Sequence, residues 1–153
     1  MTDEPPNGHN FVELGVDECI ALLASTDVGR LCVIDHGHPV AYPVNYRVVP
    51  DGRGNVALVL RTRADSMLDQ PDTPAGFEID SVDSLTETGW SVVLRGTLLR
   101  ADGPTVPFWV RAWDPRPRLA GRDTWLYFVS TAISGRRLMD GVPEWAFSVH
   151  GYI

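Results

Sequence analysis

The hydrophobic and polar positions follow one period near the N-terminus and another in the rest of the chain. Residues 16–25 carry apolar side chains at Val16, Ile20 and Leu23, which is the spacing of one helix face. From residue 28 onward, short apolar runs alternate with segments rich in Gly, Pro, Asp and Asn, a pattern typical of β-strands and turns. The sequence therefore predicts a mostly β protein with one short N-terminal helix.

The apolar runs define six strands and a final short one. We expect these strands at residues 28–35, 39–49, 55–62, 75–82, 90–101, 123–134 and 144–153. A tight turn at residues 36–38 joins the first two, and the short connections favour a closed or partly closed antiparallel barrel over a βαβ fold. Residues 11–153 are then one domain, preceded by a loosely held tail at residues 1–10.

Some local features add detail to this barrel. Residues 56–60 are apolar at every position, so we expect both faces of that strand to be buried. Pro43 lies inside the second strand, where its missing backbone N–H implies an edge position or a bulge. We expect one or two helical turns at residues 64–70 and a connection at 135–138. Residues 102–121 resist assignment, which suits a mobile or partner-contacting segment.

Charge and composition argue against several classes of function. The chain has 153 residues and a formal net charge of −7, which disfavours broad nucleic-acid or membrane-surface binding. We see no apolar run long enough to span a membrane and no signal peptide in the acidic N-terminus. Cys19 and Cys32 are expected to be buried, reduced thiols. These features indicate a cytoplasmic protein.

The end of the third strand carries the clearest polar cluster. Arg61, Thr62 and Ser66 combine a guanidinium with two hydroxyl groups, which are donors that bind phosphate. The helical turns expected after Thr62 would add free backbone N–H groups. The alternative is that Arg61 only forms a surface ion pair at the end of a buried strand.

Other candidate residues give weaker signals. Pro43 could leave backbone groups free beside Asn45 and Tyr46, although an ordinary edge strand explains the same pattern. The five tryptophans are expected mainly in the core or at an interface. Trp109 and Trp113 lie in the unassigned segment, where they could cover an aromatic ligand or contact a partner subunit.

Metal binding and side-chain acid–base catalysis are not indicated. His36 and His38 lie in a turn without a third ligand nearby, so we expect them to be solvated. Glu78 and Asp80 alternate with apolar residues on one strand, and we expect them to face solvent or an arginine. The sequence contains no Walker loop, dinucleotide fingerprint, GxSxG or HExxH motif.

In their order along the chain, these segments resemble the pyridoxamine 5′-phosphate oxidase-like family of FMN-binding split barrels, especially its small actinobacterial-type members. The matching segments are ECIALLASTDVGRL, PVAYPVNY, LVLRT with Ser66 and Leu68, FEID, GWSVVLRG, and WDPRPRLAGRDTWLYF with SGRRL. The resemblance covers roughly residues 13–138. It implies a six-stranded antiparallel split β-barrel that forms a homodimer, with FMN bound between the subunits.

The resemblance also implies which residues hold the cofactor. The residues between 61 and 68 belong to the phosphate turn, and residues 44–46 flank the flavin ring. Residues 90 and 91 lie in the interface strand, and Trp113 approaches the flavin from the partner chain. These implied cofactor-binding residues are Val44, Asn45, Tyr46, Arg61, Thr62, Arg63, Ser66, Met67, Leu68, Trp90, Ser91 and Trp113.

The phosphate turn departs from the family pattern. Family members commonly carry Gly-Ser-Lys-Leu there, whereas this chain has Asp-Ser-Met-Leu at residues 65–68. Asp65 would repel a phosphate and Met67 supplies no charge, but Arg63 could compensate because arginine binds phosphate through two hydrogen bonds. We therefore expect Met67→Lys to tighten FMN binding and Arg61→Ala to weaken it.

The sequence leaves three functions open. The first is a flavin-dependent oxidoreductase acting on an unknown small molecule, with redox chemistry carried by FMN or by deazaflavin F420. The second is a dimer that binds or sequesters a flavin without catalysis. The third is a degenerate barrel that has lost flavin binding and serves as an interaction module.

Overall fold

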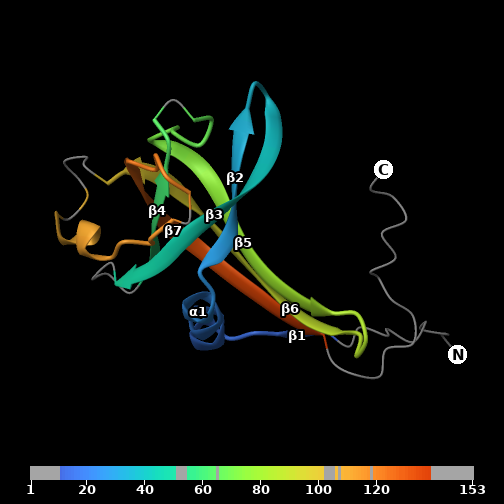
Figure 1. The fold of residues 1–153 in the computed structure, drawn as a ribbon. Coiled ribbons are helices and arrows are strands. Elements are labelled where there is room, and N and C mark those ends of the chain that lie inside the picture. The colour runs from blue at the N-terminus through green and yellow to red at the C-terminus, as the bar shows by residue number, and fades with distance from the viewer. Residues whose placement is uncertain are drawn as a thin grey trace, which may run out of the picture.

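A computed structural model of the chain describes residues 11–50, 55–64, 66–101, 106, 108–117 and 119–138. The expected tail at 1–10 and the expected strand at 144–153 lie outside these residues. In chain order the elements are β1 (Phe11–Glu13), α1 (Val16–Ser25), β2 (Val28–Asp35), β3 (His38–Pro50), β4 (Val56–Thr62), β5 (Thr73–Asp83), β6 (Thr88–Arg100), the 3-10 helix η1 (Phe108–Ala112) and β7 (Thr124–Leu138) (Figure 1).

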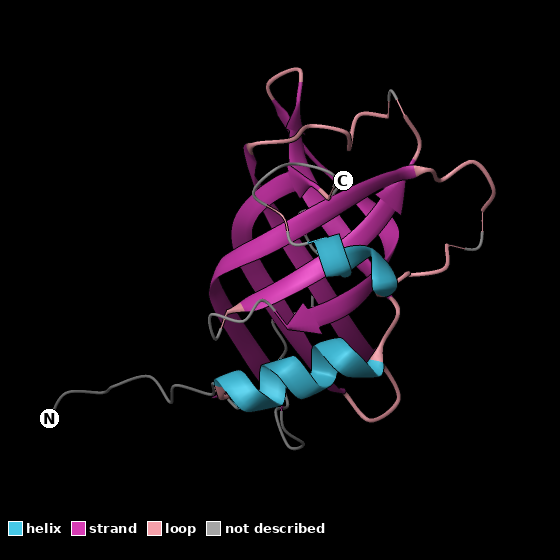
Figure 2. Ribbon diagram, turned by 90° about the vertical axis from the view of Figure 1, so that its left-hand side faces the viewer, coloured by secondary structure: helices cyan, strands magenta, loops and turns pink. Residues whose placement is uncertain are grey.

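Six of the strands form a closed antiparallel ring. The hydrogen-bonded order is β1-β7-β4-β3-β2-β5-β6, and a further pairing between β6 and β7 closes the ring. The strands curve into a barrel, with α1 lying across one end (Figure 2). The predicted mostly β split barrel is thereby confirmed. A seventh strand that the sequence pattern did not reveal, β1, pairs with the end of β7.

The barrel interior holds the main hydrophobic core. Alternate residues of each strand face inward, as the two-residue period of a strand requires. They pack with two residues of α1 and one residue of the turn after β4. The buried members of this cluster are Cys19, Leu23, Leu31, Val33, Val44, Tyr46, Val56, Leu58, Leu60, Leu68, Phe77, Ile79, Val92, Leu94, Leu98, Leu126 and Phe128.

Tyr46 ties α1 to the barrel. Its hydroxyl donates to the Leu23 carbonyl at 2.6 Å, and the Thr26 hydroxyl lies 2.6 Å from the same oxygen. The Leu23 carbonyl belongs to the last turn of α1, where backbone acceptors lack partners within the helix. The Tyr46 ring also packs edge-on against Phe77, with 4.8 Å between the ring centroids. The end of α1 is therefore held by a hydrogen bond from the barrel wall.

The strand β4 is buried on both faces, as its apolar run predicted. Leu58 and Leu60 point into the barrel, whereas Ala57 and Val59 belong to a second cluster on the outside. Val106 and the helix η1 cover that outer cluster. The described part of the segment that the sequence left unassigned thus covers the outer faces of β4 and β7.

Pro43 occupies the predicted edge position. The strand β3 pairs with β2 through residues 38–45 but with β4 only from Tyr46 onward. One side of β3 at Pro43 is therefore without a neighbouring strand among the described residues. The missing backbone N–H of proline costs no ladder hydrogen bond on such a side.

Two predicted connections differ from the structure. The described residues between 64 and 70 form turns and not a helix: the Ser66 N–H donates to the Arg63 carbonyl and the Asp69 N–H to the Ser66 carbonyl. The chain reaches Pro71 before a helical ladder can become established. Residues 135–138 belong to β7, because β1 and β6 pair with this part of β7.

Candidate functional site

Arg61 is held by other parts of its own chain. Its guanidinium donates to both oxygens of Asp114, at 3.0 and 3.2 Å, and its Nε donates to the Arg122 carbonyl at 2.7 Å. The same group lies 4.9 Å from the centroid of the Trp125 ring. Only 20% of the Arg61 side chain is exposed. These contacts correspond to the ion-pair alternative drawn from the sequence.

The carboxylate of Asp114 is stabilised in its ionised form. The Arg116 backbone N–H donates at 2.9 Å to Oδ1, the same oxygen that Arg61 contacts at 3.0 Å. These hydrogen bonds, that of the Arg116 N–H first, hold the pKa of Asp114 below its usual range. An anionic ligand would have to displace a stably ionised carboxylate to reach Arg61.

Thr62 and Ser66 lie together at the end of β4. Their hydroxyl oxygens are 2.7 Å apart, and the Leu68 N–H donates to the Ser66 oxygen at 3.2 Å. Thr62 is 5% exposed and points to the same side as the inward-facing Leu60. Arg61 precedes it and therefore points to the opposite face of the strand. The structure brings the two hydroxyls together and places the Arg61 guanidinium elsewhere.

The remaining residues of the phosphate turn vary in accessibility. Arg63 is exposed and forms no ion pair with another described residue. Met67 is 40% exposed, and its carbonyl accepts a hydrogen bond from the Gln70 side chain. Leu68 is buried and belongs to the barrel core. Because one of the two hydroxyls donates its proton to the other, the donors that remain are one hydroxyl and the exposed Arg63 guanidinium, a set that suits a phosphate.

The three residues expected beside a flavin ring are differently placed. Val44 and Tyr46 are buried in the barrel core, and burial raises the pKa of the Tyr46 hydroxyl. Asn45 is half-buried on the opposite side of β3, and its amide nitrogen donates to the Asp27 carbonyl at 3.3 Å. Of these residues, only Asn45 has a side chain within reach of a ligand outside the core.

Trp90 and Ser91 lie far from the phosphate turn within one chain. They pair with Arg137 and Arg136 on β7, whereas Arg61 pairs with Trp125. Trp125 and Arg137 are twelve residues apart, which is roughly 40 Å of extended strand. Residues from both places can surround one ligand only if two chains contribute.

Trp113 packs on its own chain. It belongs to the outer cluster beside β4, and the Arg47 guanidinium lies 5.3 Å from its ring centroid. This cation–aromatic contact and the neighbouring apolar residues hold the half-buried ring in place. The structure therefore gives Trp113 a packing role within the described residues.

The acidic pair on β5 meets an arginine, as predicted. Arg30 donates to Glu78 at 2.8 Å and to Asp80 at 3.2 Å on the outer face of the sheet. Burial raises the pKa of Glu78, and the neighbouring Asp80 adds to that effect. Among the described residues, no group of three or more His, Cys, Asp or Glu side chains is arranged to hold a metal ion.

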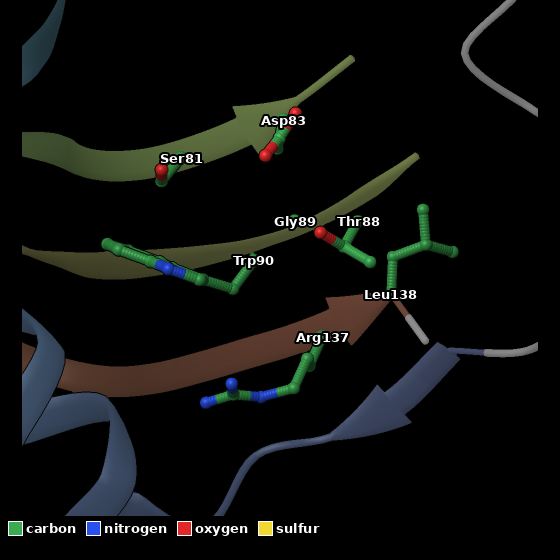
Figure 3. A pocket seen from close by; sticks show the side chains of 7 residues that line it. All are labelled: Ser81, Asp83, Thr88, Gly89, Trp90, Arg137 and Leu138. Atoms are coloured by element: carbon green, nitrogen blue, oxygen red, sulfur yellow. The ribbon is translucent and has the colours of Figure 1, made fainter. Parts of the chain in front are cut away.

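Sequence reasoning missed a polar site at the far end of the sheet. A cavity of about 430 Å³ lies there between β5, β6 and β7, with Thr88, Trp90 and Arg137 in its wall (Figure 3). A smaller cavity of about 240 Å³ includes Arg136 and Ser91. The sequence pattern predicts a connection for Gly-Arg-Arg at 135–137, whereas in the structure these residues belong to β7 and their side chains alternate between the two sheet faces.

The described residues include no helix that is long and apolar enough to cross a membrane. This finding concerns α-helical spans within the described ranges.

Comparisons with known proteins agree with this architecture. Residues 15–137 match the protein family described as pyridoxamine 5′-phosphate oxidase. Protein Rv0080 of Mycobacterium tuberculosis, which is uncharacterised, is 34% identical over 108 residues, or 65% of this chain and 67% of that protein. The FAD-binding protein of Mycobacterium smegmatis has a similar structure, with a TM-score of 0.62 and 24% identity over 84% of this chain and 99% of the other. Protein DIP1874 of Corynebacterium diphtheriae, a conserved protein of unknown function, gives a TM-score of 0.70 and 22% identity, covering 85% of this chain and 99% of the other.

The matching region runs from the start of α1 to the end of β7 and so contains the whole closed barrel. The similar structures share that barrel over most of their length. The chain therefore belongs to the pyridoxamine 5′-phosphate oxidase family.

Proposed function

We propose that this protein is a homodimer that binds FMN and uses it to oxidise or reduce a small molecule. Family membership supports a flavin ligand, and the structurally similar M. smegmatis protein binds FAD. The flavin supplies the redox chemistry when bound, so the protein needs chiefly to bind and orient it. This requirement fits a chain in which no acid–base pair is evident among the described residues.

The observation that carries the proposal is the hydroxyl pair at the end of β4. Thr62 and Ser66 place two oxygens 2.7 Å apart, next in sequence to the exposed Arg63. Hydroxyl and guanidinium groups donate to phosphate oxygens, and the arginine supplies the compensating charge. We assign the FMN phosphate to Thr62, Arg63 and Ser66, while Arg61, on the opposite face of β4, holds the surrounding chain through Asp114.

The ring of the flavin would extend from this turn toward β3. Asn45 is half-buried there and carries both an amide donor and an amide acceptor, the groups that orient a flavin ring by hydrogen bonding. We assign it this orienting role. Val44 and Tyr46 would support the position of Asn45 from within the core.

The homodimer part of the proposal rests on the outer face of the sheet. Val28, Val82 and Val93 are 45%, 53% and 40% exposed, and all three lie on the side of the sheet that carries Glu78 and Asp80. Apolar side chains gathered on one exposed face are typical of an interaction surface. Ser91 lies on this same face and would reach the partner subunit's flavin, in line with its expected place in the interface strand. Light scattering coupled to gel filtration tests the dimer, and a purely monomeric protein would contradict it.

The test of the cofactor assignment is a parallel titration with FMN, FAD and deazaflavin F420. We expect saturable binding of FMN that is tighter than that of the other two. Tighter binding of FAD or the deazaflavin would move the assignment to that cofactor. Anaerobic addition of NADH or NADPH to the FMN-loaded protein then tests nicotinamide-driven turnover, for which bleaching of the flavin is the expected result.

The second candidate function is a barrel that has lost flavin binding and serves as an interaction module. The contact between Arg61 and Asp114 favours it, because this guanidinium is already satisfied within the chain. The position occupied by lysine in family members is Met67, which adds no charge. A protein that is purified colourless and binds none of the three cofactors would establish this alternative over the first.

A further inference from the structure

The far end of the sheet presents a row of side chains on one face. Ser81 pairs with Trp90, and Trp90 pairs with Arg137, so these residues lie side by side across β5, β6 and β7. Asp83 and Thr88 pair two positions further along and project from the same face. Together they border the cavity of about 430 Å³, which we call the hairpin site. Its volume is within the range of about 300–1,000 Å³ that small-molecule sites have.

Trp90 forms the aromatic wall of the hairpin site. Figure 3 shows its indole lying between Ser81 on β5 and Arg137 on β7. One part of the side chain packs on the barrel core and the rest is exposed to the cavity. Its indole N–H donates to none of the described residues. A half-buried indole whose N–H has no partner in the described part of the chain suits a planar ligand that also carries an acceptor.

Arg137 supplies positive charge beside this ring. Its side chain is 43% exposed, and among the described residues it forms one ion pair, with Glu18 on α1 at 3.9 Å. Because Glu18 is itself 62% exposed, this pair is a weak surface contact. A guanidinium has five N–H donors, so most of them stay available to an anion.

Asp83 lies across the cavity from Arg137 and disfavours a second negative charge on the ligand. Its Oδ1 accepts hydrogen bonds from the Leu85 and Thr86 backbone N–H groups, at 2.9 and 3.3 Å. These bonds lower the pKa of Asp83, so the carboxylate is ionised at neutral pH. A second anionic group on the ligand would be repelled at this rim, whereas one anionic group near Arg137 would be attracted.

We propose that the hairpin site binds a planar aromatic carboxylate, with its ring against Trp90 and its carboxylate paired with Arg137. The residues involved are separate from the phosphate turn, and the proposal does not depend on flavin binding. In this proposal Trp90 contacts a ligand bound within its own chain, on the sheet face opposite to the one that carries Ser91.

The test is calorimetric titration of the full chain with 2-naphthoate, a planar aromatic carboxylate. We expect one site per chain, and at least about a tenfold loss of affinity in Arg137→Gln, since a charge-assisted hydrogen bond is lost. Arg136→Gln is the matched control: it removes the same charge at the next residue, which points to the other sheet face. Trp90→Leu should also weaken binding, because the aromatic wall is removed.

A second measurement does not depend on any variant folding correctly. The uncharged naphthalene-2-carboxamide should bind the unmodified protein at least about tenfold more weakly than 2-naphthoate if the anion is recognised. Equal affinity for the two compounds, no saturable binding of 2-naphthoate, or equal losses in Arg136→Gln and Arg137→Gln would each overturn the proposal. Displacement of 2-naphthoate by FMN would also overturn it, because the cavity would then belong to the flavin.

Discussion

The guanidinium of Arg61 donates to both carboxylate oxygens of Asp114, at 3.0 and 3.2 Å. This contact joins the end of β4 to the chain that follows η1. Arg61, which the sequence pattern indicates as a phosphate ligand, therefore stabilises the fold. The cation available at the phosphate turn is Arg63, on the other side of Thr62 in the sequence.

Asp114→Asn should remove a pH-dependent part of the stability. The Arg116 N–H and Arg61 lower the pKa of Asp114 below its ordinary value of 3.8. A lowered pKa stabilises the folded state above the ordinary value, and this contribution disappears as the pH falls through the folded-state pKa. Urea unfolding near neutral pH should show the variant less stable by at most about 1 kcal/mol, because the carboxylate is partly exposed. The two proteins should converge in acid, and a pH-independent difference would contradict this account.

Met67→Lys should tighten the binding of phosphate-bearing flavins. The added ammonium would lie in the phosphate turn, where Met67 is 40% exposed and a longer polar side chain can reach solvent. We expect about a tenfold gain for FMN and no change for riboflavin, which lacks the phosphate. Leu85→Lys is the control, since Leu85 is 93% exposed in the distant turn between β5 and β6. An equal gain in both variants would point to net charge alone.

Tyr46→Phe should loosen the end of α1 without altering the barrel. The variant loses the hydrogen bonds to the Leu23 carbonyl and the Thr26 hydroxyl, which should lower the free energy of unfolding by about 1–2 kcal/mol. Tyr42→Phe removes a hydroxyl that has no hydrogen-bond partner among the described residues, and it should leave stability nearly unchanged. Equal unfolding midpoints for the two variants would show that the Tyr46 hydroxyl does not anchor α1.

Gly96→Ala should destabilise the closure of the barrel. A Cβ at this position would collide with the Val129 backbone carbonyl, at the point where the register between β6 and β7 shifts. Such overpacking costs about 1–3 kcal/mol. Gly76→Ala, where the nearest atom is the Cys32 Cβ at 3.5 Å, is the matched control on the neighbouring strand. Thermal unfolding compares them, and similar melting temperatures would contradict the predicted collision.

Periodicity predicted the parts of the fold that have a continuous local pattern. The helix α1 and the strand β2 begin and end where the sequence analysis put them, because their apolar spacing is regular and turn residues bound it. By contrast, β1 has only three residues and exists through its pairing with the end of β7. A segment that short carries no readable period, so only the folded chain reveals it.

The candidate site was less predictable because its geometry depends on contacts distant in sequence. Arg61 and Asp114 are 53 residues apart, and nothing near either residue signals the pairing. Strand alternation did contain one usable signal, since neighbours such as Arg61 and Thr62 must face opposite ways. The same rule places Arg136 and Arg137 on opposite sheet faces, and each of these arginines lines a different cavity.

The central claim is that the phosphate of a flavin binds at Thr62, Arg63 and Ser66. It is tested most directly by titrating FMN into the unmodified protein and into Ser66→Ala, Arg63→Gln and the exposed β7 control Ser134→Ala, with flavin fluorescence as the readout. We predict saturable binding to the unmodified protein, about a tenfold or greater loss in Arg63→Gln and a smaller loss in Ser66→Ala, with Ser134→Ala unchanged. Absence of FMN binding to the unmodified protein, or equal affinity in all four proteins, would contradict the claim.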